Sequence, residues 1–182
     1  MRDTYRIAVI GMGPRGLGAL EALADRLPAQ GPRIQVDVYD TLVPLGAGPN
    51  FDPAESPLCK LNIPVRDIDI APPAFSGIGS FTDFQESGLE PDDFPTRAEM
   101  GRYLAARYQD LIDRNALEIV HFAAQVTAIE QSPSGWTVQT SDRTAPVYHE
   151  VLMTVGQPAV QPDPQLDEWQ RHAKETSATL AT

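Results

Sequence analysis

The chain has 182 residues, 42% of them hydrophobic and 21% charged, which is enough for one globular domain with its own core. Its net charge of −11 repels a phosphate backbone, so we expect no nucleic acid partner. The single cysteine excludes an internal disulfide, and no apolar run is long enough for a secretory signal or a membrane span. We therefore expect a cytoplasmic protein, with no membrane contact. No metal site is expected, because the three histidines stand apart from one another and from Cys59.

The first part of the chain predicts a β-α-β unit. Residues 5–10 form a short apolar run, typical of a buried parallel strand. A helix is expected from Pro14, because proline suits the first helical turn and leucines then recur at helical spacing. A second strand is predicted over residues 34–39 and ends at Asp40.

A long Pro- and Gly-rich stretch follows, over residues 41–95. It shows little periodicity, and a loop of this length inside a small domain is usually a functional surface. The next helix is predicted over residues 96–115. Thr96 and Glu99 make a capping-box pattern there, in front of an apolar stripe.

The last third of the chain predicts strands and one short helix. The strand-like runs are residues 119–122, 126–130, 136–140 and 147–155. A short helix is expected around residues 166–173. We place one domain at residues 1–160, with the 41–95 loop region inside it, and treat 161–182 as a C-terminal helix and tail. The predicted fold class is α/β, a Rossmann-like domain with a parallel sheet and a β-meander.

The turn after the first strand carries the sequence GMGPRG, from Gly11 to Gly16. A glycine pattern of this kind is weak evidence alone, but here it lies between an apolar strand and an amphipathic helix. The acid that ends the second strand, Asp40, follows Gly16 by 24 residues (40 − 16), close to the roughly 20 of the dinucleotide-binding fingerprint. The alternative is a glycine turn that only connects a strand to a helix.

Each position of the fingerprint has a physical role. Gly11 permits the tight turn, Gly13 lets the backbone approach a pyrophosphate, and Gly16 lets the helix pack closely on the strand. The helix N-terminus favours phosphate groups. Asp40 accepts hydrogen bonds from ribose hydroxyls and disfavours a 2′-phosphate, so NADP is a poor ligand for this site. The other acid of the second strand, Asp37, is interpreted as a solvated side chain.

These residues resemble a known family. Residues 7–24 look like the N-terminus of two-dinucleotide-domain flavoproteins, in which GPxGL is common. The resemblance is closest to the FAD/NAD(P)-binding group that includes flavin-containing and N-hydroxylating monooxygenases, and covers their N-terminal FAD-binding part. Other segments similar to that group are residues 61–64, 94–97, 126–129, 135–138 and 151–156.

The resemblance implies FAD as the cofactor and makes residues 1–160 an FAD-binding domain. It places the Val126 backbone near the adenine and Thr154 and Gly156 near the pyrophosphate. Gly46, Gly48 and Asn62 would approach the flavin end. The predicted cofactor-binding residues are Gly11, Gly13, Pro14, Arg15, Gly16, Asp40, Thr41, Gly46, Gly48, Asn62, Val126, Thr154 and Gly156. No side chain is predicted to be an acid-base catalyst, since the chemistry would belong to the isoalloxazine.

We expect two departures from this family. No second glycine fingerprint follows the strand that ends at Gly156, and the family's C-terminal part, which helps hold the isoalloxazine, has no counterpart in this sequence. NAD(P)H, if it is the reductant, would therefore bind at a site outside this chain. A subunit of a split enzyme, a truncated chain and a reduced relative all fit. An open edge where the missing part would dock predicts an exposed apolar surface and a partner chain or a homo-oligomer.

Three functions are compatible with these patterns. The favoured one is the FAD-binding portion of a flavin-dependent oxidoreductase of monooxygenase-like type, completed by a partner chain. The alternatives are a non-catalytic FAD- or ADP-binding module and an NAD-dependent dehydrogenase. The dehydrogenase predicts further β-α units after Asp40, which the sequence does not offer. Arg66 and Arg97 are candidates to meet an anionic substrate or a phosphate, although a surface ion pair is the more common role.

Overall fold

A four-stranded parallel sheet organises the chain. The computed structural model describes residues 4–28, 31–68, 71–85, 88–114, 117–141, 146–157 and 164–178. The strand order is β3-β2-β1-β6, and every neighbouring pair is parallel. The bounds of the strands are Thr4–Ile10 for β1, Arg33–Tyr39 for β2, Glu118–Phe122 for β3 and Glu150–Met153 for β6. The predicted α/β class with a parallel sheet is confirmed.

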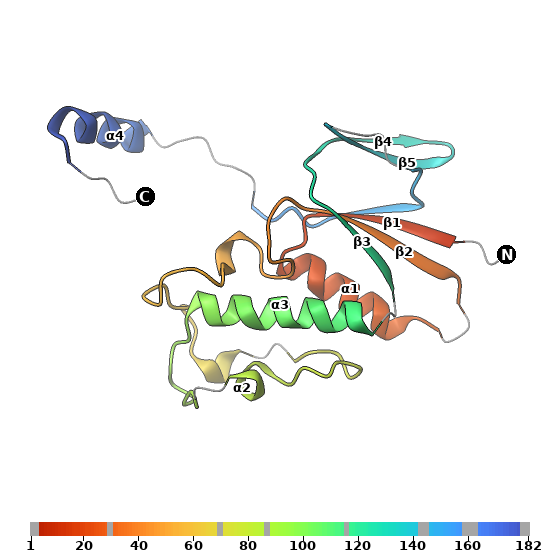
Figure 1. The fold of residues 1–182 in the computed structure, drawn as a ribbon, viewed down its shortest axis with the longest axis horizontal. Coiled ribbons are helices and arrows are strands. Elements are labelled where there is room, and N and C mark those ends of the chain that lie inside the picture. Colours follow the sequence, from red (N-terminus) through yellow and green to blue (C-terminus); the bar gives the residue numbers. More distant parts are fainter. Residues whose placement is uncertain are drawn as a thin grey trace.

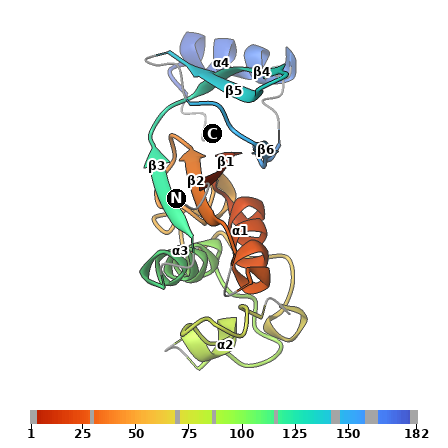
Figure 2. The ribbon, with the colours of Figure 1, turned by 90° about the vertical axis from the view of Figure 1, so that its right-hand side faces the viewer.

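Two helices cover one face of this sheet and a hairpin covers the other (Figures 1 and 2). The helices are α1 (Pro14–Arg26) and α3 (Arg97–Asp113). The hairpin pairs β4 (Val126–Ser132) with β5 (Gly135–Thr140). The molecule is thus layered as helices, sheet and hairpin, and the carboxyl ends of the strands remain open for a ligand.

The larger part of the core lies between the sheet and the helices. β1 and β2 contribute fully buried side chains at Val9, Val36 and Val38, and they pack against leucines of α1 and aromatic residues of α3. These apolar stripes recur at helical spacing, and burying them is the main stabilising contribution to the fold.

A smaller core lies between the sheet and the hairpin, and it contains a polar cluster that the sequence interpretation missed. Asp37 is only 2% exposed, so its interpretation as a solvated side chain is wrong. Its carboxylate accepts hydrogen bonds from the Tyr148 hydroxyl at 2.7 Å and from the Gln35 amide at 3.1 Å. The Tyr148 and Tyr39 hydroxyls also lie 2.6 Å apart. Asp37 is buried because both faces of this part of the sheet are covered. Side chains on either face of the strand then lie inside the protein.

Several predicted elements differ by a few residues in their bounds. The helix expected over 96–115 begins at Arg97, with Thr96 as its N-cap in the predicted capping box. The strand expected over 147–155 is shorter, because Tyr148 pairs with Trp136 of the hairpin and only the next residues join the sheet.

The long loop region lies along α3, and its described residues contain three short helical turns. They are η1 (Pro49–Phe51), η2 (Val65–Asp67) and α2 (Phe81–Phe84). Two stretches of the loop run side by side, since Leu61 N–H donates to Pro95 O and Val65 N–H donates to Asp93 O. The short helix α2 was not predicted, although Ser80 and Asp83 form a capping box for it.

The last helix, α4 (Pro164–Thr176), has no buried residue. It lies away from the sheet in Figure 1, with Trp169 half exposed. In the ranges that the structure describes, no helix is both long and apolar enough to cross a membrane.

Candidate functional site

The glycine turn joins β1 to α1 at the carboxyl end of the sheet. Gly11 has a φ of +88°, and a Cβ atom there would lie 2.8 Å from the Thr154 carbonyl oxygen. Hydrogen bonds hold this crossing: Gly11 N–H donates to Tyr39 O at 2.9 Å and Thr154 N–H donates to Ile10 O at 2.8 Å. Glycine is therefore required at position 11 by the backbone itself.

Gly16 is required by the packing of the helix on the turn. A Cβ atom at this position would lie 2.8 Å from the Gly11 carbonyl oxygen and 3.1 Å from Thr154 Oγ1. The same Thr154 hydroxyl donates to Gly11 O at 2.5 Å. Thr154 thus holds the turn by a hydrogen bond. Gly16 lets the helix pack closely against the turn, as the fingerprint predicts for its third glycine.

Gly13 differs from both of these glycines. Its φ of −84° suits any residue, and the nearest atom to an added Cβ is the Gly48 Cα at 3.6 Å, an ordinary contact. Neither the backbone nor the packing demands glycine at this position. A side chain at position 13 would instead extend beside the turn, into the cavity described below.

The N-terminus of α1 opens at this turn. Gly13 is its N-cap and Pro14 its first residue, and among the described residues no side chain caps it and no acid lies in its first turn. The first N–H groups of a helix lack intrahelical acceptors and carry the positive end of the helix dipole. This end is suited to an anionic group such as a pyrophosphate.

Asp40 has a second role beside the one predicted for it. Its Oδ2 accepts a hydrogen bond from Met12 N–H at 2.6 Å, and its Oδ1 accepts one from Leu42 N–H at 2.8 Å. The carboxylate therefore ties the end of β2 to the glycine turn. Because a carboxylate has about four acceptor positions, about two remain open to other hydrogen-bond donors.

A cavity of about 720 Å³ lies over the turn, and we call it the first cavity. It brings together ten of the thirteen predicted cofactor residues from four separate parts of the chain. These are Gly11, Gly13, Pro14, Arg15, Asp40, Thr41, Gly48, Val126, Thr154 and Gly156.

The other three predicted residues lie outside the first cavity. Gly16 packs beneath the turn, as described above. Gly46 has a φ of +92°, and a Cβ atom there would lie 2.7 Å from the Leu104 carbonyl oxygen of α3. Its N–H donates to Met12 O at 2.7 Å, so Gly46 fastens the loop region to the turn. Asn62 lines a separate, neighbouring cavity.

This second cavity has a volume of about 650 Å³. It shares Pro14, Asn50 and Phe51 with the first cavity, so the two are adjoining. Its wall is mostly apolar and comes from α1, α3 and the loop region. The apolar lining residues are Leu17, Phe51, Leu61, Ile63, Met100 and Leu104.

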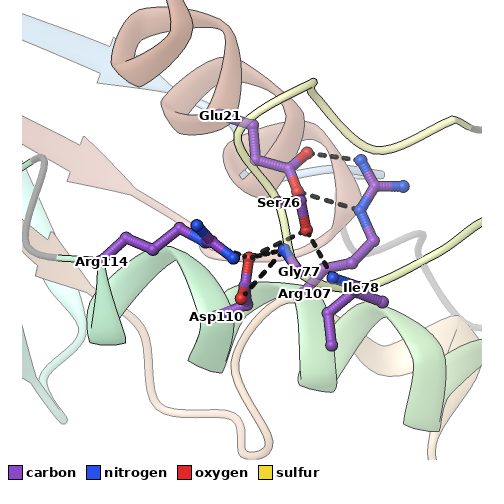
Figure 3. Close-up of polar contacts among 7 residues, drawn as sticks. All are labelled: Glu21, Ser76, Gly77, Ile78, Arg107, Asp110 and Arg114. Atoms are coloured by element: carbon purple, nitrogen blue, oxygen red, sulfur yellow. Dashed lines mark hydrogen bonds and ion pairs between the residues drawn. The ribbon is translucent and has the colours of Figure 1, made fainter.

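A buried ion pair lies in the wall of the second cavity. Glu21 of α1 and Arg107 of α3 are 4% and 5% exposed. Arg107 Nε donates to Glu21 Oε1 at 2.9 Å and its Nη2 donates to Oε2 at 2.5 Å, as Figure 3 shows. The sequence interpretation missed this pair. The sequence did contain a sign of it, because a glutamate and an arginine each interrupt the apolar stripe of their helix.

Asp110, also in Figure 3, fastens the loop region to the other end of α3. Its carboxylate accepts hydrogen bonds from the Ser76 hydroxyl at 2.8 Å, the Gly77 N–H at 3.2 Å and Arg114 Nε at 3.0 Å. Burial opposes ionisation, but these hydrogen bonds outweigh it and lower the pKa of Asp110.

Comparison with known proteins identifies the family. The FAD-NAD(P)-binding family matches residues 8–158. The chain belongs to this family. Its sequence is 31% identical to nitrosuccinic acid synthase npaA of Aspergillus oryzae, over 92% of this chain and 28% of that protein. The predicted family and cofactor class are therefore confirmed.

Solved structures share the fold. A flavin-containing monooxygenase from Stenotrophomonas maltophilia superposes with a TM-score of 0.57 at 22% identity, over 88% of this chain and 42% of that one. OTEMO in complex with FAD and NADP gives a TM-score of 0.55 at 16% identity, over 88% of this chain and 27% of that one. The chain thus spans 27% to 42% of the length of these relatives.

Proposed function

We propose that the first cavity binds FAD and that the chain is the FAD-binding part of a flavin-dependent, monooxygenase-like oxidoreductase. Gly13 is the observation that carries this proposal, because its φ and its packing do not require glycine, whereas a pyrophosphate against the backbone would. Bound FAD would supply hydride and electron transfer. The part of this chain is to hold and orient it.

The roles of the lining residues follow from their chemistry. The free N–H groups at the start of α1 and the backbone of Gly13 would hold the pyrophosphate. The Asp40 carboxylate would accept from the adenosine ribose, and the Val126 backbone would lie near the adenine. Asn62, in the second cavity, would lie toward the flavin.

Activity of the whole protein would need more than these residues. This chain matches 27% to 42% of the length of its relatives. We therefore propose that the NAD(P)H site lies outside this chain. A partner chain or a second copy is proposed to complete the enzyme. Size-exclusion chromatography with light scattering, with and without FAD, tests the second copy.

A non-catalytic FAD- or ADP-binding module is the alternative function. This module would bind its ligand in the same first cavity. It differs from the oxidoreductase only in that the bound flavin is never reduced. Bleaching of the bound flavin by NADPH, measured at 450 nm with the completing partner present, separates the two. Bleaching supports the oxidoreductase, and a flavin that stays oxidised supports the module.

The decisive experiment is an FAD titration of Gly13→Val followed by flavin fluorescence. We expect FAD affinity to fall at least about 100-fold, since the side chain takes the space of the phosphates. Thermal unfolding should stay within a few degrees of the parent chain. Ala22→Val is the matched control, because Ala22 is an exposed residue of the same helix and lines neither cavity. Undiminished FAD binding by Gly13→Val would contradict the proposal.

A further inference from the structure

Arg97 gives the second cavity an unbalanced positive charge. The charged residues in its wall are Glu21, Arg97 and Arg107. Glu21 and Arg107 neutralise each other in the buried ion pair, which leaves the charge of Arg97. A local excess of positive charge in a chain with a net charge of −11 concentrates anions at that point.

Arg66 and Arg97, the two arginines singled out in the sequence, have different surroundings. The guanidinium of Arg66 forms an ion pair with Asp92, and Asp67 lies 3.9 Å from it. In the described part of the chain, no carboxylate lies within ion-pair distance of the Arg97 guanidinium. The Cys59 thiol lies close to the Glu55 carboxylate, which raises the pKa of the thiol, and to Arg97, whose charge opposes that shift. The ion pair expected of a surface arginine is therefore present at Arg66 and not found at Arg97.

The position of Arg97 is fixed by its backbone. It is the first residue of α3, and its N–H donates to Cys59 O at 2.8 Å, next to the capping box of Thr96. Arg97 thus lines the second cavity from the first turn of a helix whose start is held in place. A site built on a helix terminus holds its groups more precisely than one on a loop.

Two amides complete the polar part of this wall. Asn50 and Asn62 both line the second cavity, and no hydrogen bond of either side chain is recorded among the described residues. Each amide offers two N–H donors, and a guanidinium offers a planar fork that matches a carboxylate. The rest of the wall is apolar, which suits the carbon skeleton of a small organic acid.

We propose that Arg97, assisted by Asn50 and Asn62, binds the carboxylate of a small organic acid substrate in the second cavity. This inference rests on the proposed function, because the substrate must lie beside the flavin end of the FAD site. The same chemistry would also suit a phosphate of the cofactor. The experiment below separates these two sources.

The test titrates the chain with succinate and benzoate, and with their neutral amides succinamide and benzamide, at constant ionic strength. Binding is measured by calorimetry, with and without FAD, and by the change in the flavin absorption spectrum. We expect at least one acid to bind at least about 10-fold more tightly than its amide, the size of one charge-assisted hydrogen bond. Equal binding of acid and amide in both pairs would overturn the proposal.

The variants are Arg97→Gln, Arg97→Lys and, as the matched control, Arg66→Gln. Arg97→Gln should weaken binding of the acid about 10-fold and leave FAD affinity unchanged, Arg97→Lys should restore part of it, and Arg66→Gln should change neither. Loss of FAD affinity in Arg97→Gln with unchanged acid binding would assign Arg97 to the cofactor and overturn the proposal. A chain that binds no FAD refutes the proposed function instead, and the calorimetry without FAD then still decides whether Arg97 binds the acid.

Discussion

The two cavities are built in different ways. The first is bounded by backbone at glycine turns and strand ends, with Gly11 and Gly48 in left-handed conformations. The second is bounded by side chains of two helices and a loop, with an ion pair between residues 86 positions apart. Backbone geometry is encoded locally, whereas a wall of side chains exists only after packing. The following variants test this difference.

The largest effect is expected at the buried ion pair. Glu21→Gln leaves the Arg107 charge buried without its carboxylate, which should lower the free energy of unfolding by about 3 kcal/mol or more. Urea unfolding measures it. Glu118→Gln is the control, because its ion pair with Arg33 is exposed and should cost about 1 kcal/mol or less. Equal losses in the two variants would show that the second cavity does not depend on this pair.

The next effect separates the glycines of the first cavity. Gly11→Ala should destabilise the fold by about 2 kcal/mol or more, since it combines a left-handed φ with a Cβ close to the Thr154 carbonyl. Gly13→Ala should leave stability within about 0.5 kcal/mol, because that position has an ordinary φ and free space. Thermal unfolding of both without FAD is the measurement. A strongly destabilised Gly13→Ala would remove the argument that its glycine serves a ligand.

A third variant asks whether the first cavity also depends on buried side chains. Tyr39 lines this cavity and its hydroxyl contacts that of Tyr148, which donates to the buried Asp37. Tyr148→Phe should cost about 1–3 kcal/mol, because it leaves a buried carboxylate with one donor fewer. Tyr5→Phe, whose hydroxyl donates to Glu150 at the surface, should cost less than about 1 kcal/mol. If Tyr148→Phe weakens FAD binding and Tyr5→Phe does not, the first cavity also depends on buried side chains. The difference drawn above between the two cavities would then be wrong.

The same tyrosine predicts a loss of stability in alkali. Burial, the Tyr39 contact and Asp37 raise the pKa of Tyr148 well above its ordinary value of 10.0. The stability linked to this group is complete below pH 10 and declines as the pH rises, because the unfolded chain loses the proton first. Unfolding free energies at pH 8 and pH 11 should fall less in Tyr148→Phe than in the parent chain. Equal declines would contradict the buried contact.

The smallest effect concerns the fastening of the loop region by Asp110. Its pKa is lowered, so its stabilising effect is present above the unfolded value of 3.8 and is lost as the pH falls below it. Asp110→Asn should cost about 1 kcal/mol at pH 7 and flatten the decline in stability between pH 5 and pH 3. Asp25→Asn, an exposed helix position, is the control. An unchanged acid decline in Asp110→Asn would refute this role.

The sequence by itself determined the β-α-β unit, the glycine turn and the family. These features depend on neighbouring residues: an apolar run, glycines at fixed offsets, a proline and a capping box from Thr96 to Glu99. The first cavity followed from them because the carboxyl ends of parallel strands meet at one edge of a sheet. The remaining cofactor residues, such as Val126 and Asn62, came from the resemblance to flavoproteins.

Only the tertiary structure decided the second cavity and the buried polar groups. Glu21 and Arg107 become partners because α1 and α3 pack side by side, and Asp37 is buried because the hairpin covers its face of the sheet. The difference between Arg66 and Arg97 likewise depends on which carboxylates the folded loop brings near each one. Local sequence patterns do not encode such pairings. The pairings form when segments distant in the sequence are desolvated and come into contact.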